Sequence, residues 1–281
     1  MTKQIIIESP RADSLPLLFD SPHSGTNYPA DFDHVLDRMT LRRSEDAFIE
    51  ELYDHVPDQG ATLLHALFPR CYIDPNRGLE DIDPDMIDGG WAGECRPSFK
   101  QANGIGLIWR QVKTYGRIYD RLLSREEVQA RIDLCWRPYH DALSGLFEDH
   151  HSRHGFVYHV DCHSMPEWGD ETTEDGPVRR ADFVLGDRDG TTCGKDFSAL
   201  IAETLRDLGY SVKMNDPYKG VELVRRYSDP SQGRHSIQIE INRALYMNEG
   251  GITKSERFGD LKLSLKKLTE VLAGYVSAKC G

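Results

Sequence analysis

Two segments of the chain share one pattern, in which an apolar run leads into a polar loop with a histidine followed by a serine. They are residues 19–25 (FDSPHSG) and 160–166 (VDCHSMP). A histidine just after a buried strand has a fixed backbone, so its imidazole can be aimed at a metal ion. A lone loop histidine more often serves only as a hydrogen-bonding group, but two in matching contexts favour the metal site. We therefore expect His23 and His163 to be metal ligands.

A catalytic zinc site needs three protein ligands and one open position. The H-x-x-E and H-E-x-x-H spacings are absent, so the third ligand has to come from elsewhere in the chain. The nearest acids after His23 are Asp31, Asp33, Glu45 and Asp46. Asp46 has the best context, because an apolar stripe predicts a helix from Ser44 to about His55 with Asp46 in its first turn. Acids are favoured in that turn by the helix dipole alone, so the two interpretations of Asp46 are even and Glu45 stays open.

Glu240 is the carboxylate best suited to move a proton. Residues 237–241 (IQIEI) alternate as a strand, with the isoleucines on one face and Gln238 and Glu240 on the other. A carboxylate at that place could take a proton from water and hand it to a leaving amine. The alternative is a solvated residue on a strand with one buried face. Asn242 and Arg243 follow directly, and this polar cluster favours the site.

Arginines are the groups expected to bind an anionic substrate. Arg77 follows Asn76 and a predicted strand over residues 71–73, while Arg243 follows Asn242. Arg225, Arg226 and Arg234 gather near Arg243 in the sequence. Guanidinium groups recognise carboxylates through paired hydrogen bonds, although a single arginine more often makes a surface salt bridge. Arg77 and Arg243 are the exceptions, because each follows a short strand.

Composition narrows the class of protein. The 281 residues carry 34 Lys+Arg and 46 Asp+Glu, a net charge of 34 − 46 = −12, which argues against a general nucleic-acid binder. No apolar run approaches the roughly 18 residues of a membrane span, and the N-terminal segment does not resemble a signal peptide. The six cysteines form no C-x-x-C pair and suit free thiols in a reducing compartment. These features predict a cytoplasmic globular protein without a membrane or nucleic-acid partner.

The chain shows no repeat or linker, so we expect one domain over residues 1–281. Strands alternate with helices, which predicts an α/β layer architecture. In such folds ligands bind at the carboxyl ends of the strands, where both histidine segments fall. A capping box at residues 124–127 (SREE) predicts the start of a long helix, which Pro138 should kink or split.

With these residues in view, the chain resembles the N-formylglutamate amidohydrolase family. The motifs that carry the resemblance run in order through most of the chain: residues 21–25 (SPHSG), 74–77 (DPNR), 161–165 (DCHSM), 187–193 (DRDGTTC) and 238–246 (QIEINRALY). The resemblance implies a three-layer α/β/α fold with a central mixed sheet, like that of the zinc carboxypeptidases. It also implies zinc-assisted hydrolysis of the formyl amide of glutamate, the last step of one route of histidine degradation.

Carried over residue by residue, the resemblance makes His23 and His163 ligands of one zinc ion, with Asp46 as the third. It makes Glu240 the general base. The residues expected to bind the substrate are Arg77, Arg243, Arg225 and Asn76. One departure lies at residues 215–221 (NDPYKGV), where the family often has N-x-P-Y-x-G-G, and a changed loop is compatible with another N-acyl amino acid.

The leading hypothesis is therefore hydrolysis of N-formyl-L-glutamate to L-glutamate and formate by a zinc enzyme. A metallo-deacylase or carboxypeptidase that cleaves another acyl group or a short peptide is the alternative within the same class. A non-catalytic protein that binds small acids is the alternative from another class. The expected partner is a small anionic N-acyl amino acid, and no oligomeric state follows from the sequence.

Overall fold

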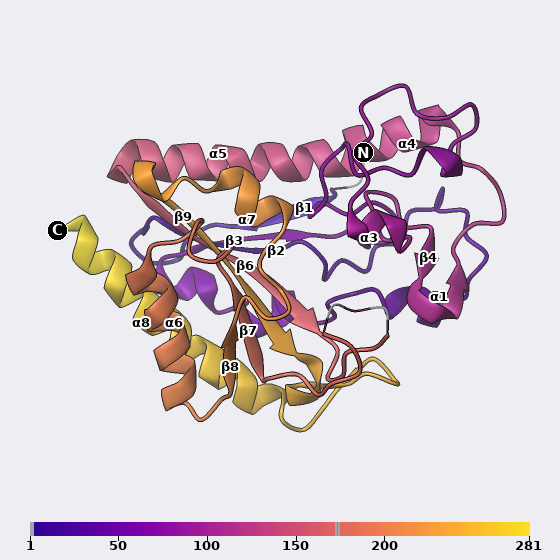
Figure 1. Ribbon diagram of the computed structural model, residues 1–281. Coiled ribbons are helices and arrows are strands. Elements are labelled where there is room, and N and C mark those ends of the chain that lie inside the picture. The colour runs from indigo at the N-terminus through magenta and orange to yellow at the C-terminus, as the bar shows by residue number, and fades with distance from the viewer. Residues whose placement is uncertain (1–2, 172, 174) are drawn as a thin grey trace. The chain divides into compact units, whose positions relative to one another are not determined.

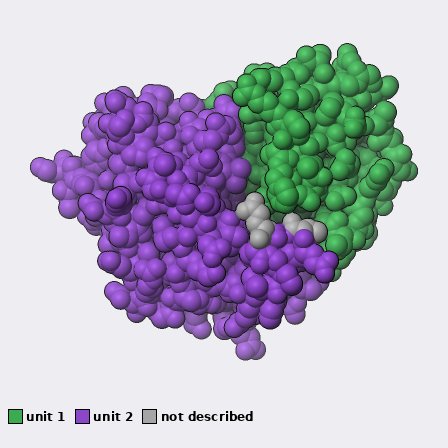
Figure 2. All heavy atoms as spheres, viewed as in Figure 1, with its two compact units in different colours: residues 1–6, 22–47, 66–142 green, residues 7–21, 48–65, 143–281 purple. Residues whose placement is uncertain are grey.

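The computed structural model describes residues 3–171, 173 and 175–281, which lie in two compact units. Residues 3–6, 22–47 and 66–142 form unit 1, and the described parts of residues 7–21, 48–65 and 143–281 form unit 2 (Figure 2). The backbone passes between the units several times. The prediction of a single domain over residues 1–281 stays a prediction, and residues 1, 2, 172 and 174 lie outside the described residues.

A mixed β-sheet dominates unit 2. Seven strands of the described residues form it, in the order β1 (Ile5–Glu8), β3 (Thr62–Ala66), β2 (Leu17–Ser21), β6 (Val157–Met165), β9 (Arg234–Asn242), β7 (Phe183–Gly186) and β8 (Val212–Met214). The pairs β3–β2, β2–β6, β6–β9 and β7–β8 are parallel, whereas β9–β7 is antiparallel. The predicted α/β class with a mixed central sheet is therefore confirmed.

Helices cover both faces of this sheet, as neighbouring residues of β6 show. The ring of Tyr158 packs 4.4 Å from Phe197 of α6 (Lys195–Asp207) and 5.7 Å from Tyr275 of α8 (Phe258–Cys280), measured between centroids. The ring of His159 lies 5.2 Å from Phe147 of α5 (Arg137–His154). Successive strand residues point to opposite faces, so α5 lies on one side and α6 and α8 on the other, as predicted (Figure 1).

The two central strands carry the candidate site residues. All nine residues of β6 are buried, and in β9 the isoleucines at 237, 239 and 241 are fully buried. β-branched side chains pack well on a pleated surface, which explains why this segment is a strand. β6 is longer than predicted, because the polar residues after Val160 continue the ladder with β9 as far as Met165. His163 therefore lies within a strand and not in the predicted loop.

Unit 1 holds mostly short elements joined by turns. They are α1 (Arg38–Arg42), α3 (Phe99–Ala102), α4 (Arg125–Arg131), β4 (Gln111–Val112), β5 (Gly116–Arg117), η2 (Pro84–Met86) and η3 (Lys113–Tyr115). The predicted capping box is present, since Ser124 and Glu127 each bond the other's backbone N–H. A π-helical turn, η4 (Ile132–Trp136), follows α4 and ends just before Pro138, where the ring removes an N–H donor. The helical segment continues from residue 125 to residue 154 without a gap, so the predicted split into two separate helices is wrong, and Pro138 lies next to a π-turn.

The remaining elements belong to unit 2. They are α2 (Ile49–Leu52), α7 (Glu222–Tyr227), β10 (Met247–Asn248), β11 (Thr253–Lys254), η1 (Val56–Gln59), η5 (Pro230–Gln232) and η6 (Arg243–Leu245). Among the residues that the structure describes, no helix combines the length and apolar character needed to cross a membrane.

Two local predictions are wrong. The helix expected from Ser44 is absent, because Phe48 adopts a left-handed backbone with φ +68° and only Ile49–Leu52 is helical. Asp46 therefore lies in a turn, and the helix dipole does not account for its presence. The strand expected at residues 71–73 is a turn, in which the Tyr72 N–H donates to the Pro69 carbonyl. Arg77 consequently follows a buried turn.

Candidate metal centre and active site

The loop after β2 holds His23 in a fixed, fully buried position. β2 ends at Ser21, two residues earlier. A Cβ at Gly25 would lie 2.3 Å from the Phe68 carbonyl oxygen, so only glycine allows this close approach of the two backbones. The Asn27 N–H donates to the Leu67 carbonyl at 2.8 Å and fastens the loop further. The imidazole therefore has little freedom to turn away.

Both ring nitrogens of His23 face carboxylates within unit 1. Nε2 lies 2.7 Å from Asp74 Oδ1, and because an ionised carboxylate only accepts, Nε2–H donates. Nδ1 lies 3.3 Å from Asp46 Oδ2, and with the proton on Nε2 its lone pair is available to a metal ion held between the two side chains. Two ligand atoms about 2.0–2.2 Å from one tetrahedral zinc ion are separated by roughly this distance. The His23–Asp46 pair therefore fits two neighbouring ligands of a metal ion, with Asp74 fixing the imidazole from behind.

Asp74 is buried but well supplied with donors. Arg70 Nη2 and Trp109 Nε1 donate to its Oδ2 at 3.0 and 3.2 Å, and the Asn76 N–H donates to Oδ1 at 2.9 Å. Burial alone raises the pKa of the Asp74 carboxyl, but the charges of Arg70 and Arg77 and the hydrogen bond from His23 outweigh it and hold the pKa well below its usual range. Asp74 is thus an anion suited to orient His23.

Their different hydrogen-bond partners distinguish Asp46 from Glu45 as a candidate metal ligand. The Glu45 carboxylate accepts from Tyr28 at 2.8 Å and from Arg42 at 3.0 Å. Asp46 instead faces His23, and its backbone N–H donates to the His23 carbonyl at 3.0 Å. The Asp46 side chain is nearly fully buried, and its Oδ1 lies 3.7 Å from Arg70 Nη1. The geometry in unit 1 therefore favours Asp46 over Glu45 as a ligand.

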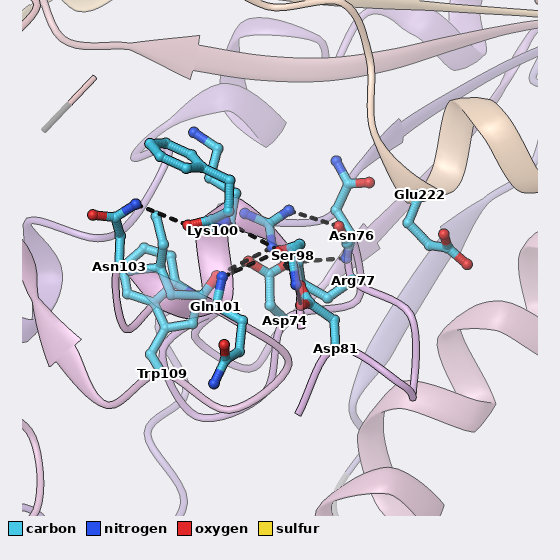
Figure 3. A network of polar contacts seen from close by, with 12 residues as sticks. Asp74, Asn76, Arg77, Asp81, Ser98, Lys100, Gln101, Asn103, Trp109 and Glu222 are labelled. Carbon is cyan, nitrogen blue, oxygen red and sulfur yellow. Dashed lines mark hydrogen bonds and ion pairs between the residues drawn. The ribbon is translucent and has the colours of Figure 1, made fainter. Parts of the chain in front are cut away.

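Asn76 and Arg77 continue from Asp74 into a polar network of the same unit (Figure 3). Arg77 donates through Nη1 to the Asn76 carbonyl at 2.8 Å and through Nε to the Ile105 carbonyl at 3.2 Å. Its Nε lies 3.7 Å from Asp81 Oδ2, and Asp81 accepts from Ser98. Arg77 is only 5% exposed, and these contacts hold its guanidinium in one orientation, three residues after Asp74 in the chain. Such a fixed cation suits recognition of a carboxylate.

We expect Asp74→Asn to weaken metal binding about 10- to 100-fold, the usual cost of losing an outer-shell partner. The amide keeps the shape of the side chain but removes the charge that orients His23. Competition with a chromophoric chelator measures the affinity. Asp85→Asn, at an exposed aspartate of the same unit, is the control. Equal affinities of the two variants would contradict the role assigned to Asp74.

In unit 2, parallel pairing brings His163 and Glu240 to the same level of the sheet. They are register partners in β6 and β9, so both side chains point to the same face, which is the face that α5 covers. His163 Nε2 lies 2.8 Å from Asp161 Oδ1. Burial raises the pKa of the Asp161 carboxyl, the charge of His163 opposes this, and the charge of Asp20 adds to it. His163 thus has an aspartate beside it, as His23 does in unit 1.

Two neighbours organise the end of β9. Gln238 Nε2 donates to Glu240 Oε1 at 2.9 Å, which confirms that these two side chains share a face. Arg243 follows the strand and donates from Nε to Ser164 Oγ, next to His163, at 3.0 Å. Glu240 and Arg243 are 8% and 9% exposed, so a carboxylate and a guanidinium are both buried at this end of the strand.

Arg225 is placed differently from the other predicted arginines. It lies on α7, its side chain is half exposed, and Nη2 contacts Glu222 Oε2 at 2.5 Å. Arg226, the next residue of the helix, contacts the same carboxylate group. The predicted role of Arg225 in substrate binding stays a prediction.

Sequence reasoning missed the role of Asp74, and it placed Gln238 on the face of Glu240 without assigning the contact between them. Asp74 stands in the motif that carries Arg77, but the contact with His23 joins residues 51 positions apart and leaves no local signal. Gln238 had a signal, because a polar residue between buried isoleucines needs a partner, and that partner is Glu240.

Comparison with known proteins identifies the family of this chain. A sequence model of the N-formylglutamate amidohydrolase family matches residues 15–247, the span that holds every site residue described above. The chain belongs to this family. An N-formylglutamate deformylase of Pseudomonas putida is 29% identical over 248 residues, 84% of this chain and 83% of that protein. The match confirms the family resemblance predicted from the sequence.

Two solved structures extend the comparison. The crystal structure of N-formylglutamate amidohydrolase from Ralstonia eutropha JMP134 is 46% identical and has a TM-score of 0.93, covering 98% of this chain and 99% of that one. A gene product of Agrobacterium tumefaciens is 19% identical with a TM-score of 0.69, covering 98% and 96%. The second likeness concerns the fold alone.

Proposed function

We propose that this chain is an N-formylglutamate deformylase that hydrolyses N-formyl-L-glutamate to L-glutamate and formate with one zinc ion. The single observation that carries the proposal is the position of the His23 imidazole. Its Nδ1 is separated from Asp46 Oδ2 by the distance expected between two ligands of one ion, and its Nε2 is fixed by the anionic Asp74. Family membership and the 46% identical amidohydrolase support the substrate. As such an enzyme, it would act last in one route of histidine degradation. Free cysteines support a cytoplasmic location.

We propose His163 as the third ligand beside His23 and Asp46. The path of the chain supports this, because His23 follows β2 directly and β2 pairs in parallel with β6, which contains His163. The three buried side chains offer one ligand atom each. A histidine–aspartate–histidine set matches the nitrogen and oxygen donors that zinc prefers at catalytic sites. When bound there, the ion activates a water molecule and polarises the amide carbonyl.

The remaining site residues either transfer protons or bind the substrate. Glu240 accepts a proton from the attacking water and returns it to the departing nitrogen, which releases glutamate and formate. Arg77 and Arg243, with Asn76, hold the substrate carboxylates through charge-assisted hydrogen bonds, and Arg225 is the further candidate for this role. A substrate held in this way through its carboxylates would present its formyl amide to Glu240.

A substrate panel tests the proposal. We expect the purified protein to release formate from N-formyl-L-glutamate with a kcat/KM at least about 100-fold above that for N-acetyl-L-glutamate, because a pocket shaped for a formyl group excludes the larger acyl group. Glutamyl dipeptides in the same panel test for carboxypeptidase activity. Formate is measured with an independent coupled dehydrogenase. Faster turnover of an acetyl or peptidyl substrate would assign the site to another deacylase or to a carboxypeptidase.

A further inference from the structure

Gln238 occupies a position in β9 where an apolar residue would be expected. It is 2% exposed, and its neighbours Ile237 and Ile239 are fully buried on the opposite face. A buried amide costs free energy unless its hydrogen bonds are made. Among the described residues, Gln238 Oε1 has no hydrogen-bond donor. Within the part of the chain that the structure describes, the buried amide therefore has one hydrogen-bonding contact, made through Nε2.

That contact is with the carboxylate of Glu240. Nε2 donates to Oε1 at 2.9 Å, between side chains two residues apart on one face of the strand. The reversed amide would set two acceptors against each other, so the orientation of Gln238 follows from the charge of Glu240. With Oε1 engaged, rotation of the carboxylate is restricted and Oε2 is presented in one direction.

The charge of a buried arginine also acts on Glu240. His163 is its register partner in β6, while Val184 is its apolar partner in β7. Arg180, before β7, and Tyr218, after β8, both interact electrostatically with Glu240. Arg180 itself is paired with Asp175, to which its Nε and Nη2 donate at 2.7 and 2.9 Å. Gln238 is a neutral donor, so it can orient the carboxylate without neutralising it.

We propose that Gln238 is a positioning residue that holds Glu240 in the orientation required for proton transfer. The inference rests on the proposed function, in which Glu240 is the general base. It assigns no direct contact between Gln238 and substrate. The consequence is that Gln238 affects catalysis only through Glu240.

The test replaces Gln238 with methionine, which has a similar length and cannot donate a hydrogen bond. We expect kcat for N-formyl-L-glutamate to fall about 10- to 100-fold with KM within about twofold, because a misplaced base slows the reaction without weakening binding. Bound metal and melting temperature should match the wild type. In a Glu240→Gln background, Gln238→Met should have no further effect, since a residue acting through Glu240 has nothing left to position.

Ile237→Val is the matched control, because it trims a buried residue on the other face of the same strand. Its kcat should stay within about twofold of wild type. An active wild-type enzyme whose Gln238→Met variant keeps its kcat would overturn the inference and leave the proposed function standing. A further loss of rate in the Glu240→Gln background would also overturn it, as it would indicate a general structural role. An inactive wild-type protein would overturn the proposed function and the inference together.

Discussion

Glu240→Gln is expected to lower kcat for N-formyl-L-glutamate by about 10²- to 10⁴-fold, the usual contribution of a positioned general base. Glutamine has the same shape and can still accept the hydrogen bond from Gln238, but it cannot take up a proton. The substrate should bind with its normal affinity, because Arg77 and Arg243 are unchanged. Formate release gives kcat, and calorimetric titration of the inactive variant gives the affinity for substrate.

A matched variant separates this effect from a general loss of charge. Glu203 is an exposed glutamate of α6, also in unit 2, and Glu203→Gln should keep full activity. A Glu240→Gln protein with an unchanged rate would remove Glu240 from the mechanism. If neither variant nor wild type released formate but all bound the substrate, the chain would be a binding protein and not an enzyme.

The site was predictable from sequence wherever its signal was local. The alternation around Glu240 predicted both its strand and the face that it shares with Gln238, because the period of a strand is visible in five residues. The two histidine segments are likewise visible within about seven residues each, as an apolar run followed by a histidine and a serine. Family motifs then connected these pieces into one expected fold, and the mixed sheet confirmed it.

Predictions failed where distant contacts decided the structure. The apolar stripe near Asp46 has a helical period, yet the left-handed backbone at Phe48 breaks it and frees Asp46 to face His23. The ladder with β9 extends β6 through polar residues that propensity assigns to a loop. Asp74 acquires its role only from a contact with His23, far away in the sequence. Tertiary contacts of this kind override local preference.

Removal of bound metal is expected to abolish activity. Dialysis against a strong chelator should lower formate release at least about 1,000-fold, and one equivalent of Zn²⁺ should restore it, because the proposed site has three protein ligands for one ion. Zinc should also raise the melting temperature of the metal-free protein, since a ligand that binds only the folded state stabilises it. Elemental analysis before and after dialysis measures the stoichiometry.

The ligand assignment is tested by His163→Ala. His23 and Asp46 alone would leave an ion with two protein ligands, so the variant should bind zinc at least about 100-fold more weakly and lose both the activity and the zinc-dependent rise in melting temperature. His151→Ala, at a histidine of α5 that contacts the Gln232 carbonyl, is the control and should behave as wild type. Full zinc affinity in His163→Ala would exclude His163 as a ligand. Activity that survives complete removal of metal would instead exclude the metal-dependent mechanism, because Glu240 can accept a proton but cannot polarise the amide carbonyl.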